Sequence, residues 1–147
     1  WCIVRKLGKR EYPNRPLLGV GAVIVKNGKI LLVKRRYDPK ANQWTLPGGL
    51  VELGEEVRQA VIREIREECG IEIEPTKIID VVDFIEKDEE EKIRYHYVLI
   101  DFEAAYKRGE LMPSSDVLNV KWFSKNELRD LEVPHITKRF LQKYYQV

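Results

Sequence analysis

The stretch GLVELGEEVRQAVIREIREECGI, residues 49–71, decides how this chain folds and where its polar chemistry lies. From Glu55 to Cys69 the residues are good helix formers with acids in the first turn, and Gly70 follows as a left-handed stop. At about 100° per residue, one face of this helix is apolar and gathers Val61, Ile62, Ile65 and Cys69. We therefore predict a helix over residues 55–69 that packs this face against the core.

The adjoining face of the same helix is acidic. Glu64 lies one turn from both Glu67 and Glu68, so three carboxylates converge at spacings of roughly 5–6 Å, where like charges cost stability. Arg63 can reach Glu67 across one turn, but a single guanidinium leaves two negative charges over. A hard divalent cation such as Mg²⁺ would balance them, and Gly48 in the preceding LPGG segment could offer it a carbonyl. The ordinary alternative is an acidic face exposed to solvent, and the wider sequence pattern must distinguish it from a cation-binding face.

Residues 49–71 have the spacing G-x5-E-x7-R-E-U-x-E-E-x-G-U, where U is a bulky aliphatic residue, and every fixed position is filled. This pattern resembles the Nudix box. The flanking segments VGAVIVKNGKILLVKRR, W-x-LPGG and VKWFSKNEL are also similar to that family. A match with so many fixed positions is far more specific than a lone GxGxxG motif. By this resemblance the chain is identified as a member of the Nudix family.

The resemblance implies an α/β/α sandwich that hydrolyses a diphosphate linking a nucleoside to another moiety. Such a reaction needs a cation to neutralise the pyrophosphate and a carboxylate to accept the proton of the attacking water. By similarity, Mg²⁺ or Mn²⁺ would be held by the carboxylates of Glu64, Glu67 and Glu68 and by the carbonyl of Gly48. Arg63 would orient the carboxylates, and Glu55 would assist nearby.

The identity of the general base is less constrained, because family members use either the glutamate after the box arginine or an acid on a later loop. We favour Glu64, followed by Asp116. Residues 106–116, YKRGELMPSSD, lie where relatives place an extra acid, and Glu110 is a further candidate there. Both loop acids could equally be ordinary polar residues of a surface loop.

Substrate contacts are expected from a run of cations that ends a strand: Lys34, Arg35 and Arg36. A guanidinium suits bidentate contact with phosphate. Because strand side chains alternate, Arg35 points opposite to its neighbours, and we select it as the substrate-binding residue, although solvated cations are the equal alternative. Tyr37, Trp44 and Phe84 could stack a base, but such aromatic residues are more often part of a core.

Outward from the helix, apolar runs alternate with turn signals. Residues 17–26 and 30–36 flank Asn27-Gly28, a strong hairpin signal, and should pair antiparallel. Residues 38–50 are rich in proline and glycine and are expected to form a loop. Further strands are expected over residues 77–86, 93–104 and 117–123, with the acidic segment KDEEEK as a hairpin tip.

The C-terminal part should be helical. Ser124 and Glu127 fit a capping box, and a last helix is expected to start near Pro134. Its apolar side would consist of Ile136, Phe140, Leu141 and Tyr144. The sum is a mixed central sheet with helices packed on it, an α/β or α+β sandwich. With no internal repeat, linker or break in composition, a single domain is expected over residues 1–147.

Composition excludes several classes of protein. The 147 residues are 44% hydrophobic and 34% charged, which excludes a collagen-like or wholly disordered chain. A net charge of +2 is too small to indicate binding to nucleic acid or to a membrane surface. No stretch approaches the about 18 apolar residues of a membrane span or resembles a secretory signal, so a cytoplasmic location is expected by default.

Cys2 and Cys69 form no CxxC pair and are expected to be thiols, and His96 and His135 are expected to be structural.

Several functions fit the pattern. The lead-in RPLLGVGAV most resembles ADP-ribose pyrophosphatases, which implies cleavage of ADP-ribose to AMP and ribose 5-phosphate. A departure from several of those enzymes is the stretch FIEKDEE, which replaces a proline downstream of the box. The alternative substrates are nucleoside triphosphates, including oxidised ones. A nucleotide-binding module without catalysis is disfavoured by the intact box, and an RNA cap hydrolase by the lack of a basic stripe. The resemblance also leaves a homodimer as an option, because many relatives are dimers.

Overall fold

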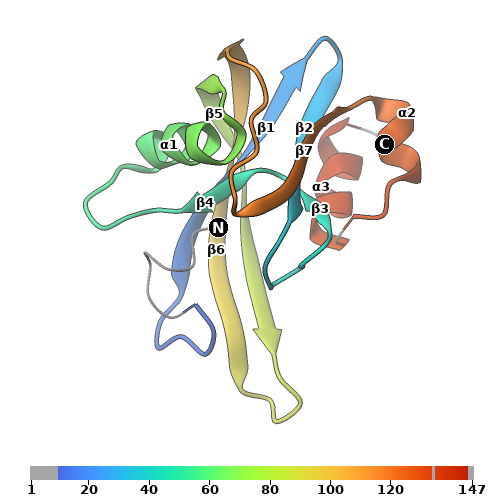
Figure 1. Ribbon diagram of the computed structural model, residues 1–147. Coiled ribbons are helices and arrows are strands. Elements are labelled where there is room, and N and C mark those ends of the chain that lie inside the picture. The colour runs from blue at the N-terminus through green and yellow to red at the C-terminus, as the bar shows by residue number, and fades with distance from the viewer. Residues whose placement is uncertain (1–9, 134, 146–147) are drawn as a thin grey trace.

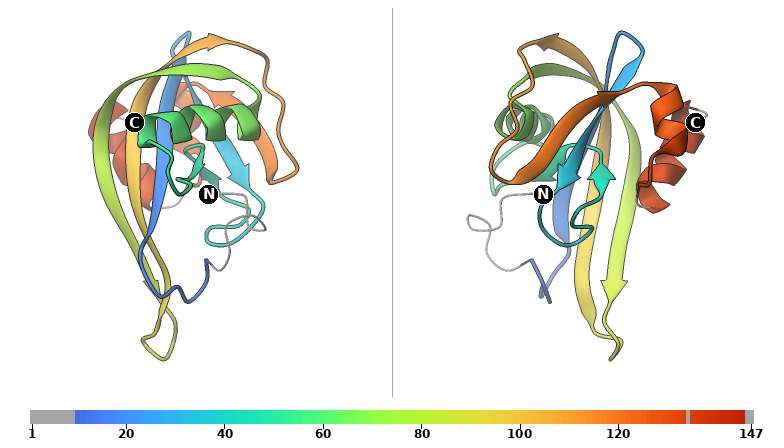
Figure 2. Two further views of the ribbon diagram at one scale, coloured as in Figure 1. Left: turned by 90° about the vertical axis from the view of Figure 1, so that its left-hand side faces the viewer. Right: turned by 45° about the vertical axis from the view of Figure 1, so that its right-hand side comes forward.

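The computed structural model describes residues 10–133 and 135–145, which form a mixed sheet with helices on both faces (Figure 1). The strands are β1 (Leu17–Lys26), β2 (Lys29–Arg35), β3 (Trp44–Thr45), β4 (Gly48–Leu50), β5 (Glu72–Lys87), β6 (Ile93–Arg108) and β7 (Val117–Phe123), and the helices are α1 (Val57–Cys69), α2 (Lys125–Asp130) and α3 (His135–Tyr145). Within these residues the strands form one seven-stranded sheet, ordered β3-β2-β1-β6-β5, with β4 paired to β1 and β7 to β2. Helix α1 covers one face and α2 with α3 the other (Figure 2), which confirms the expected sandwich.

Strand β1 is the central strand. It pairs antiparallel with β2 through a turn in which both Asn27 (φ 51°) and Gly28 (φ 75°) have positive φ, as the hairpin signal predicts. On its other side β1 runs parallel to β6, from Leu17 opposite Tyr97 onwards, and this pairing makes the sheet mixed. The N-terminal half of β1 also pairs with β4, which carries the chain into α1.

Both faces of the central strands are buried, which explains their continuous apolar runs. Alternate residues of β1, Val20, Ala22 and Ile24, pack in a cluster that contains the apolar face of α1. Val23 points to the opposite face, where the buried side chains of Leu128 from α2 and Leu141 from α3 complete a second cluster. The predicted apolar stripe of α1 is confirmed for Val61, Ile65 and Cys69, which are fully buried, while Ile62 is half-buried.

Four features of the elements differ from the predictions. Helix α1 begins at Val57 rather than Glu55, because Gly54 (φ 82°) turns the chain and Glu56 is the N-cap residue, so the first turn carries no acid. The expected loop over residues 38–50 contains the short strands β3 and β4. Strand β5 begins at Glu72 instead of residue 77 and includes Pro75, which is tolerated because β5 is an edge strand. Strand β6 extends to Arg108, beyond the predicted residue 104.

The C-terminal helices follow the predicted signals. Ser124 Oγ accepts a hydrogen bond from the Glu127 N–H (3.2 Å) and the Ser124 N–H donates to Glu127 Oε1 (3.1 Å), so the capping box is confirmed. Pro134 and the side chains of His135, Ile136, Phe140 and Tyr144 lie outside the described residues, as does Cys2, while Cys69 is a buried thiol. In the described part of the chain, none of the helices has the length and hydrophobicity to cross a membrane.

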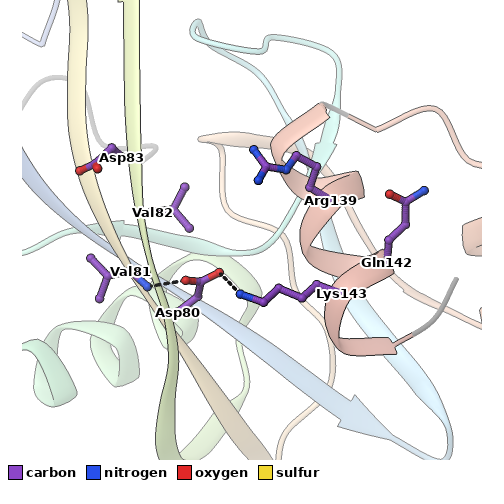
Figure 3. A pocket seen from close by; sticks show the side chains of 7 residues that line it. All are labelled: Asp80, Val81, Val82, Asp83, Arg139, Gln142 and Lys143. Atoms are coloured by element: carbon purple, nitrogen blue, oxygen red, sulfur yellow. Dashed lines mark hydrogen bonds and ion pairs between the residues drawn. The ribbon is translucent and has the colours of Figure 1, made fainter.

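Helix α3 lies beside the edge strand β5. Lys143 Nζ is 4.0 Å from Asp80 Oδ2, and the two elements border a hollow of about 650 Å³ (Figure 3). The hollow is lined by residues 80–83 of β5 and by Arg139, Gln142 and Lys143 of α3. It is therefore on the face of the sheet opposite α1.

Candidate active site

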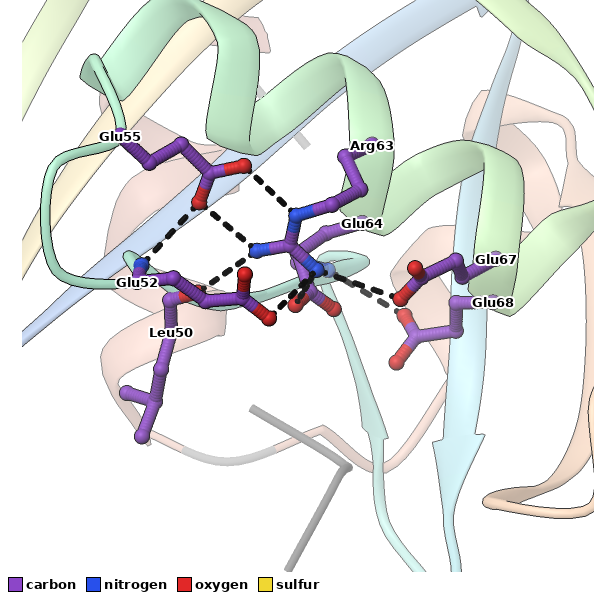
Figure 4. A network of polar contacts seen from close by, with 8 residues as sticks. Leu50, Glu52, Glu55, Arg63, Glu64, Glu67 and Glu68 are labelled. Carbon is purple, nitrogen blue, oxygen red and sulfur yellow. Dashed lines mark hydrogen bonds and ion pairs between the residues drawn. The ribbon is translucent and has the colours of Figure 1, made fainter. Parts of the chain in front are cut away.

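Arg63, in the second turn of α1, is the centre of a polar network (Figure 4). Its Nε and Nη2 donate to the two carboxylate oxygens of Glu55, at 2.6 and 2.9 Å. Its Nη1 donates to Glu64 Oε1 at 2.7 Å and to Glu67 Oε2 at 3.2 Å. One guanidinium thus contacts three carboxylates of the box, and these are the contacts that an orienting role for Arg63 requires.

Two further groups in this network were not singled out from the sequence. Arg63 Nη2 donates to the carbonyl of Leu50 at 3.0 Å, and Arg63 Nη1 lies 3.8 Å from Glu52 Oε1. The Glu52 N–H also donates to Glu55 Oε1 (3.0 Å), which folds the loop before α1 back onto the helix. Both residues occupy variable positions of the box, so its spacing contains no signal for them.

The ion pairs keep the network charged. The Glu55 carboxylate accepts two hydrogen bonds from Arg63, and these lower the pKa of Glu55 more than partial burial raises it. The pKa of Arg63 is raised, chiefly by the Glu55 carboxylate and then by Glu64, against an opposing effect of burial. Both groups are therefore ionised at neutral pH.

Glu64 and Glu68 are buried although they are acidic, with only 2% and 3% of their surface exposed, whereas Glu67 is exposed. The N–H of Gly48 donates to Glu68 Oε1 at 3.2 Å, so β4 and the last turn of α1 are joined at this carboxylate. A carbonyl contact from Gly48 to a cation was the prediction, and it stays a prediction. The contact observed here is made by the N–H of the same residue.

The donor set suits a hard divalent cation. Carboxylate oxygens are the ligands that Mg²⁺ prefers, and burial of Glu64 and Glu68 favours a compensating positive charge nearby. Among the described residues no three His, Cys, Asp or Glu side chains already have the spacing of a metal site. In this structure Glu55, Glu64 and Glu67 are each paired with Arg63. The residues fit a cation in chemistry, and a cation would compete with Arg63 for their oxygens.

The three cations at the end of β2 have different surroundings. Arg35 is buried, and its Nε donates to the carbonyl of Pro39 at 2.6 Å within the loop that follows β2. Arg36 Nη2 donates to the carbonyl of Val117 at 3.3 Å, next to Asp116. The substrate contact of Arg35 stays a prediction, and the structure gives its Nε a role in holding the loop.

The segment that contains Asp116 reaches the carboxyl end of α1. The N–H of Met112 donates to Cys69 O (2.8 Å) and the N–H of Ser114 donates to Glu68 O (3.1 Å). Asp116 is half-buried and Glu110 is exposed. The backbone of the predicted loop acid is therefore close to the last turn of α1, while a catalytic role for either acid stays a prediction.

The aromatic candidates divide between core and surface. Trp44 packs edge-on against Phe123, with ring centroids 4.9 Å apart, and Phe84 packs against the buried Tyr97 at 6.1 Å. Both contacts support the interpretation of these rings as core residues. Tyr37 is 44% exposed and His96 is half-buried.

Comparison with known proteins identifies the family of the chain. The family model described as the NUDIX domain matches residues 15–144. An ADP-ribose pyrophosphatase of Methanocaldococcus jannaschii is 35% identical over 131 residues, which is 89% of this chain and 75% of that protein. An NAD-capped RNA hydrolase of Pseudomonas aeruginosa is 30% identical over 139 residues, or 94% of this chain, but the chain spans only 46% of that protein.

Solved structures agree with the sequence relatives. A MutT Nudix hydrolase from Burkholderia pseudomallei superimposes with a TM-score of 0.77 at 36% identity, covering 89% of this chain and 99% of that one. The match therefore extends over most of both chains and shows that they share one fold. With a family model over most of its length and relatives above 30% identity, this chain belongs to the Nudix hydrolase family.

Proposed function

We propose that this chain hydrolyses the pyrophosphate bond of a nucleoside diphosphate linked to another moiety, with Mg²⁺ or Mn²⁺ as cofactor. The preferred substrate is ADP-ribose, and the products are AMP and ribose 5-phosphate. The observation that carries the proposal is the network in which Arg63 contacts Glu55, Glu64 and Glu67. The choice of ADP-ribose is supported by the name of the Methanocaldococcus jannaschii relative.

In this proposal, Glu64, Glu67, Glu68 and the Gly48 carbonyl hold the cation, which when bound neutralises the pyrophosphate and makes a coordinated water more acidic. Arg63 keeps the oxygens of Glu64 and Glu67 in one orientation through bonds of 2.7 and 3.2 Å. Glu64 accepts the proton of the attacking water, and Asp116 is the second candidate for that step. Arg35 is the proposed contact to a substrate phosphate.

A nucleoside triphosphate is the second candidate substrate. It is favoured by a CTP pyrophosphohydrolase of Escherichia coli, which is 50% identical over 54 residues, although these are only 36% of this chain. The same carboxylates and the same cation would serve this reaction. The two candidates differ in the products they release.

A panel assay with product identification separates these functions. The purified protein with Mg²⁺ is mixed in turn with ADP-ribose, NADH, a dinucleoside polyphosphate, dNTPs, 8-oxo-dGTP and an NAD-capped oligonucleotide. We expect AMP and ribose 5-phosphate from ADP-ribose, and no products from the E68Q variant. Release of pyrophosphate from a triphosphate would favour the second candidate. Binding of ADP-ribose without turnover of any compound would contradict the proposed catalysis.

A further inference from the structure

The last turn of α1 receives hydrogen bonds from a segment about forty residues later in the chain. Carbonyls at a helix C-terminus lack partners within the helix and need donors from elsewhere. Here the Met112 N–H donates to Cys69 O at 2.8 Å and the Ser114 N–H donates to Glu68 O at 3.1 Å. Residues 109–116, which we call the docking loop, are thereby fixed to the turn that contains Glu67 and Glu68.

Two glycines allow this close approach. Gly70 ends α1 with φ 79°, and Gly109 opens the docking loop with φ 105°. A Cβ on Gly70 would lie 2.9 Å from Met112 Cβ, and a Cβ on Gly109 would lie 2.9 Å from Gly70 O. Both distances are shorter than side chains tolerate, so the helix end and the docking loop fit together only because neither residue has a side chain.

Ser114 makes contacts in two directions. Its N–H is bonded to the carbonyl of Glu68, as described, and its Oγ accepts the N–H of Asp116 at 3.2 Å. The Val117 N–H also donates to Ser114 O at 3.3 Å, and Val117 O in turn accepts Arg36 Nη2. A single residue therefore joins the backbone of a proposed metal ligand to the backbone of the proposed loop acid.

We propose that Ser114 is a positioning residue for catalysis, which acts by fixing Asp116 relative to the carboxylates of α1. The Ser114 N–H fixes one end of this connection at Glu68, and the Ser114 hydroxyl fixes the other end at Asp116. Without the hydroxyl the docking loop stays attached to α1 and the Val117 N–H still bonds Ser114 O, but the N–H of Asp116 loses its hydrogen bond. The inference rests on the proposed hydrolysis at this site with Asp116 taking part in it, and its test includes a measurement that does not need turnover.

Kinetics of four variants form the first part of the test. S114A removes only the hydroxyl, S114T keeps one, and D116N removes the charge of the loop acid. S115A is the matched control, because Ser115 is the exposed neighbour of Ser114. We expect kcat of S114A to fall on the order of tenfold with little change in KM or Tm. A loss of this size is typical for residues that orient the groups around a metal without contacting it. S114T should recover most of this loss, and S115A should equal the wild type.

The double variant S114A/D116N tests whether Ser114 acts through Asp116. Residues that act as one unit have non-additive effects, so the double variant should be no slower than D116N alone. If the two losses multiply, or if S114A has the kcat of the wild type, the inference is wrong. A loss of activity matched by a large fall in Tm would assign Ser114 a merely structural role and would also overturn it.

Paramagnetic broadening separates this inference from the proposed function. Mn²⁺ is titrated into ¹⁵N-labelled protein, and broadening of the backbone amide signals of residues 114–117 is measured. We expect strong broadening at Asp116 in the wild type, S114T and S115A, and weaker broadening in S114A. This pattern in a protein that hydrolyses none of the panel would contradict the proposed function but support the role of Ser114. Identical broadening in S114A and the wild type would contradict the role of Ser114, whatever the protein hydrolyses.

Discussion

At the scale of single residues, Arg63 organises the acidic face of α1. Of its five N–H groups, two bond Glu55, two bond Glu64 and Glu67, and the fifth bonds Leu50 O. Since the Glu55 carboxylate raises the pKa of Arg63, the guanidinium keeps its charge at every pH at which a cation could bind to the carboxylates. The planar fork of an arginine is required for this set of contacts, because an ammonium cannot bond two oxygens of one carboxylate in the same plane.

The R63K variant tests this requirement. It keeps the positive charge but loses the paired bonds to Glu55 and the bond to Leu50 O, so we expect kcat to fall on the order of 10- to 100-fold, with weaker Mn²⁺ binding. R66K is the matched control, since Arg66 makes a similar two-bond contact with Glu72, with both distances 2.7 Å, but on the exposed surface of the same helix. It should keep full activity and lose less than about 1 kcal/mol of stability. Equal kinetics of R63K and wild type would remove Arg63 from the proposed site.

At the scale of elements, the spacing of apolar residues in the sequence predicted the regular helices and strands. The 3.6-residue pattern of apolar side chains located α1, and the alternating runs located β1 and β2. Strand β4 was missed because Gly48 and Gly49 have no strand propensity, and it forms only because β1 offers it a partner. The box spacing likewise placed Arg63 beside its carboxylates. It could not reveal the docking loop, because that contact joins residues distant in sequence and depends on the backbone shape at Gly70 and Gly109.

Pairing of β4 with β1 depends on the absence of a side chain at Gly48. A Cβ there would lie 2.0 Å from the carbonyl oxygen of Val20, which belongs to rigid backbone. We expect G48A to lower the free energy of unfolding by more than about 3 kcal/mol in urea denaturation. G54A is the control: its Cβ would meet nothing within 4 Å, so only the positive φ of 82° is strained, at a cost of about 1–2 kcal/mol. A smaller effect for G48A than for G54A would contradict the close packing of β4.

The β5–β6 pair contains a buried carboxyl group that should make stability depend on pH. Asp101 is 8% exposed and lies opposite Asp80 in the register, and burial, followed by the charge of Asp80, raises its pKa from 3.8 to about 7. Because the folded state then holds a proton that the unfolded state has lost, stability decreases as pH rises from about 4 to about 7. The full loss is up to about 4 kcal/mol.

The D101N variant should abolish this pH dependence. We expect it to be close to the wild type in stability at pH 4 and to be more stable at pH 8, as measured by urea unfolding at both pH values. D83N is the control, because Asp83 is an exposed carboxylate on the neighbouring strand and its removal should leave the slope unchanged. If D101N and the wild type differed in stability by the same amount at pH 4 and pH 8, folding would not raise the pKa of Asp101.

At the scale of the whole molecule, three segments distant in sequence meet at Glu68. Strand β4 contributes the Gly48 N–H to its carboxylate, and the docking loop contributes the Ser114 N–H to its carbonyl. Glu68 itself comes from α1, which packs on the sheet through its apolar face. The site is therefore complete only when the sheet, the helix and the docking loop have all folded. Any ligand that relieves repulsion among these carboxylates binds the folded state alone and should stabilise the whole chain.

Stabilisation by Mg²⁺ follows from this coupling. At a Mg²⁺ concentration 100 times its dissociation constant, the gain is about 2.7 kcal/mol, which corresponds to a rise in Tm of roughly 5–10 °C. Differential scanning calorimetry with increasing Mg²⁺, and reversal by EDTA, measures it. E68Q should show a smaller rise, since it has lost one of the proposed ligands, while its fold is kept because the amide oxygen can still accept the Gly48 N–H. E74Q, which alters an exposed surface pair with Arg58, should respond as the wild type does. An equal rise in wild type and E68Q would remove Glu68 from the proposed ligands. If Mg²⁺ left the Tm of the wild type unchanged, the acidic face of α1 would have to balance its charge through Arg63 alone.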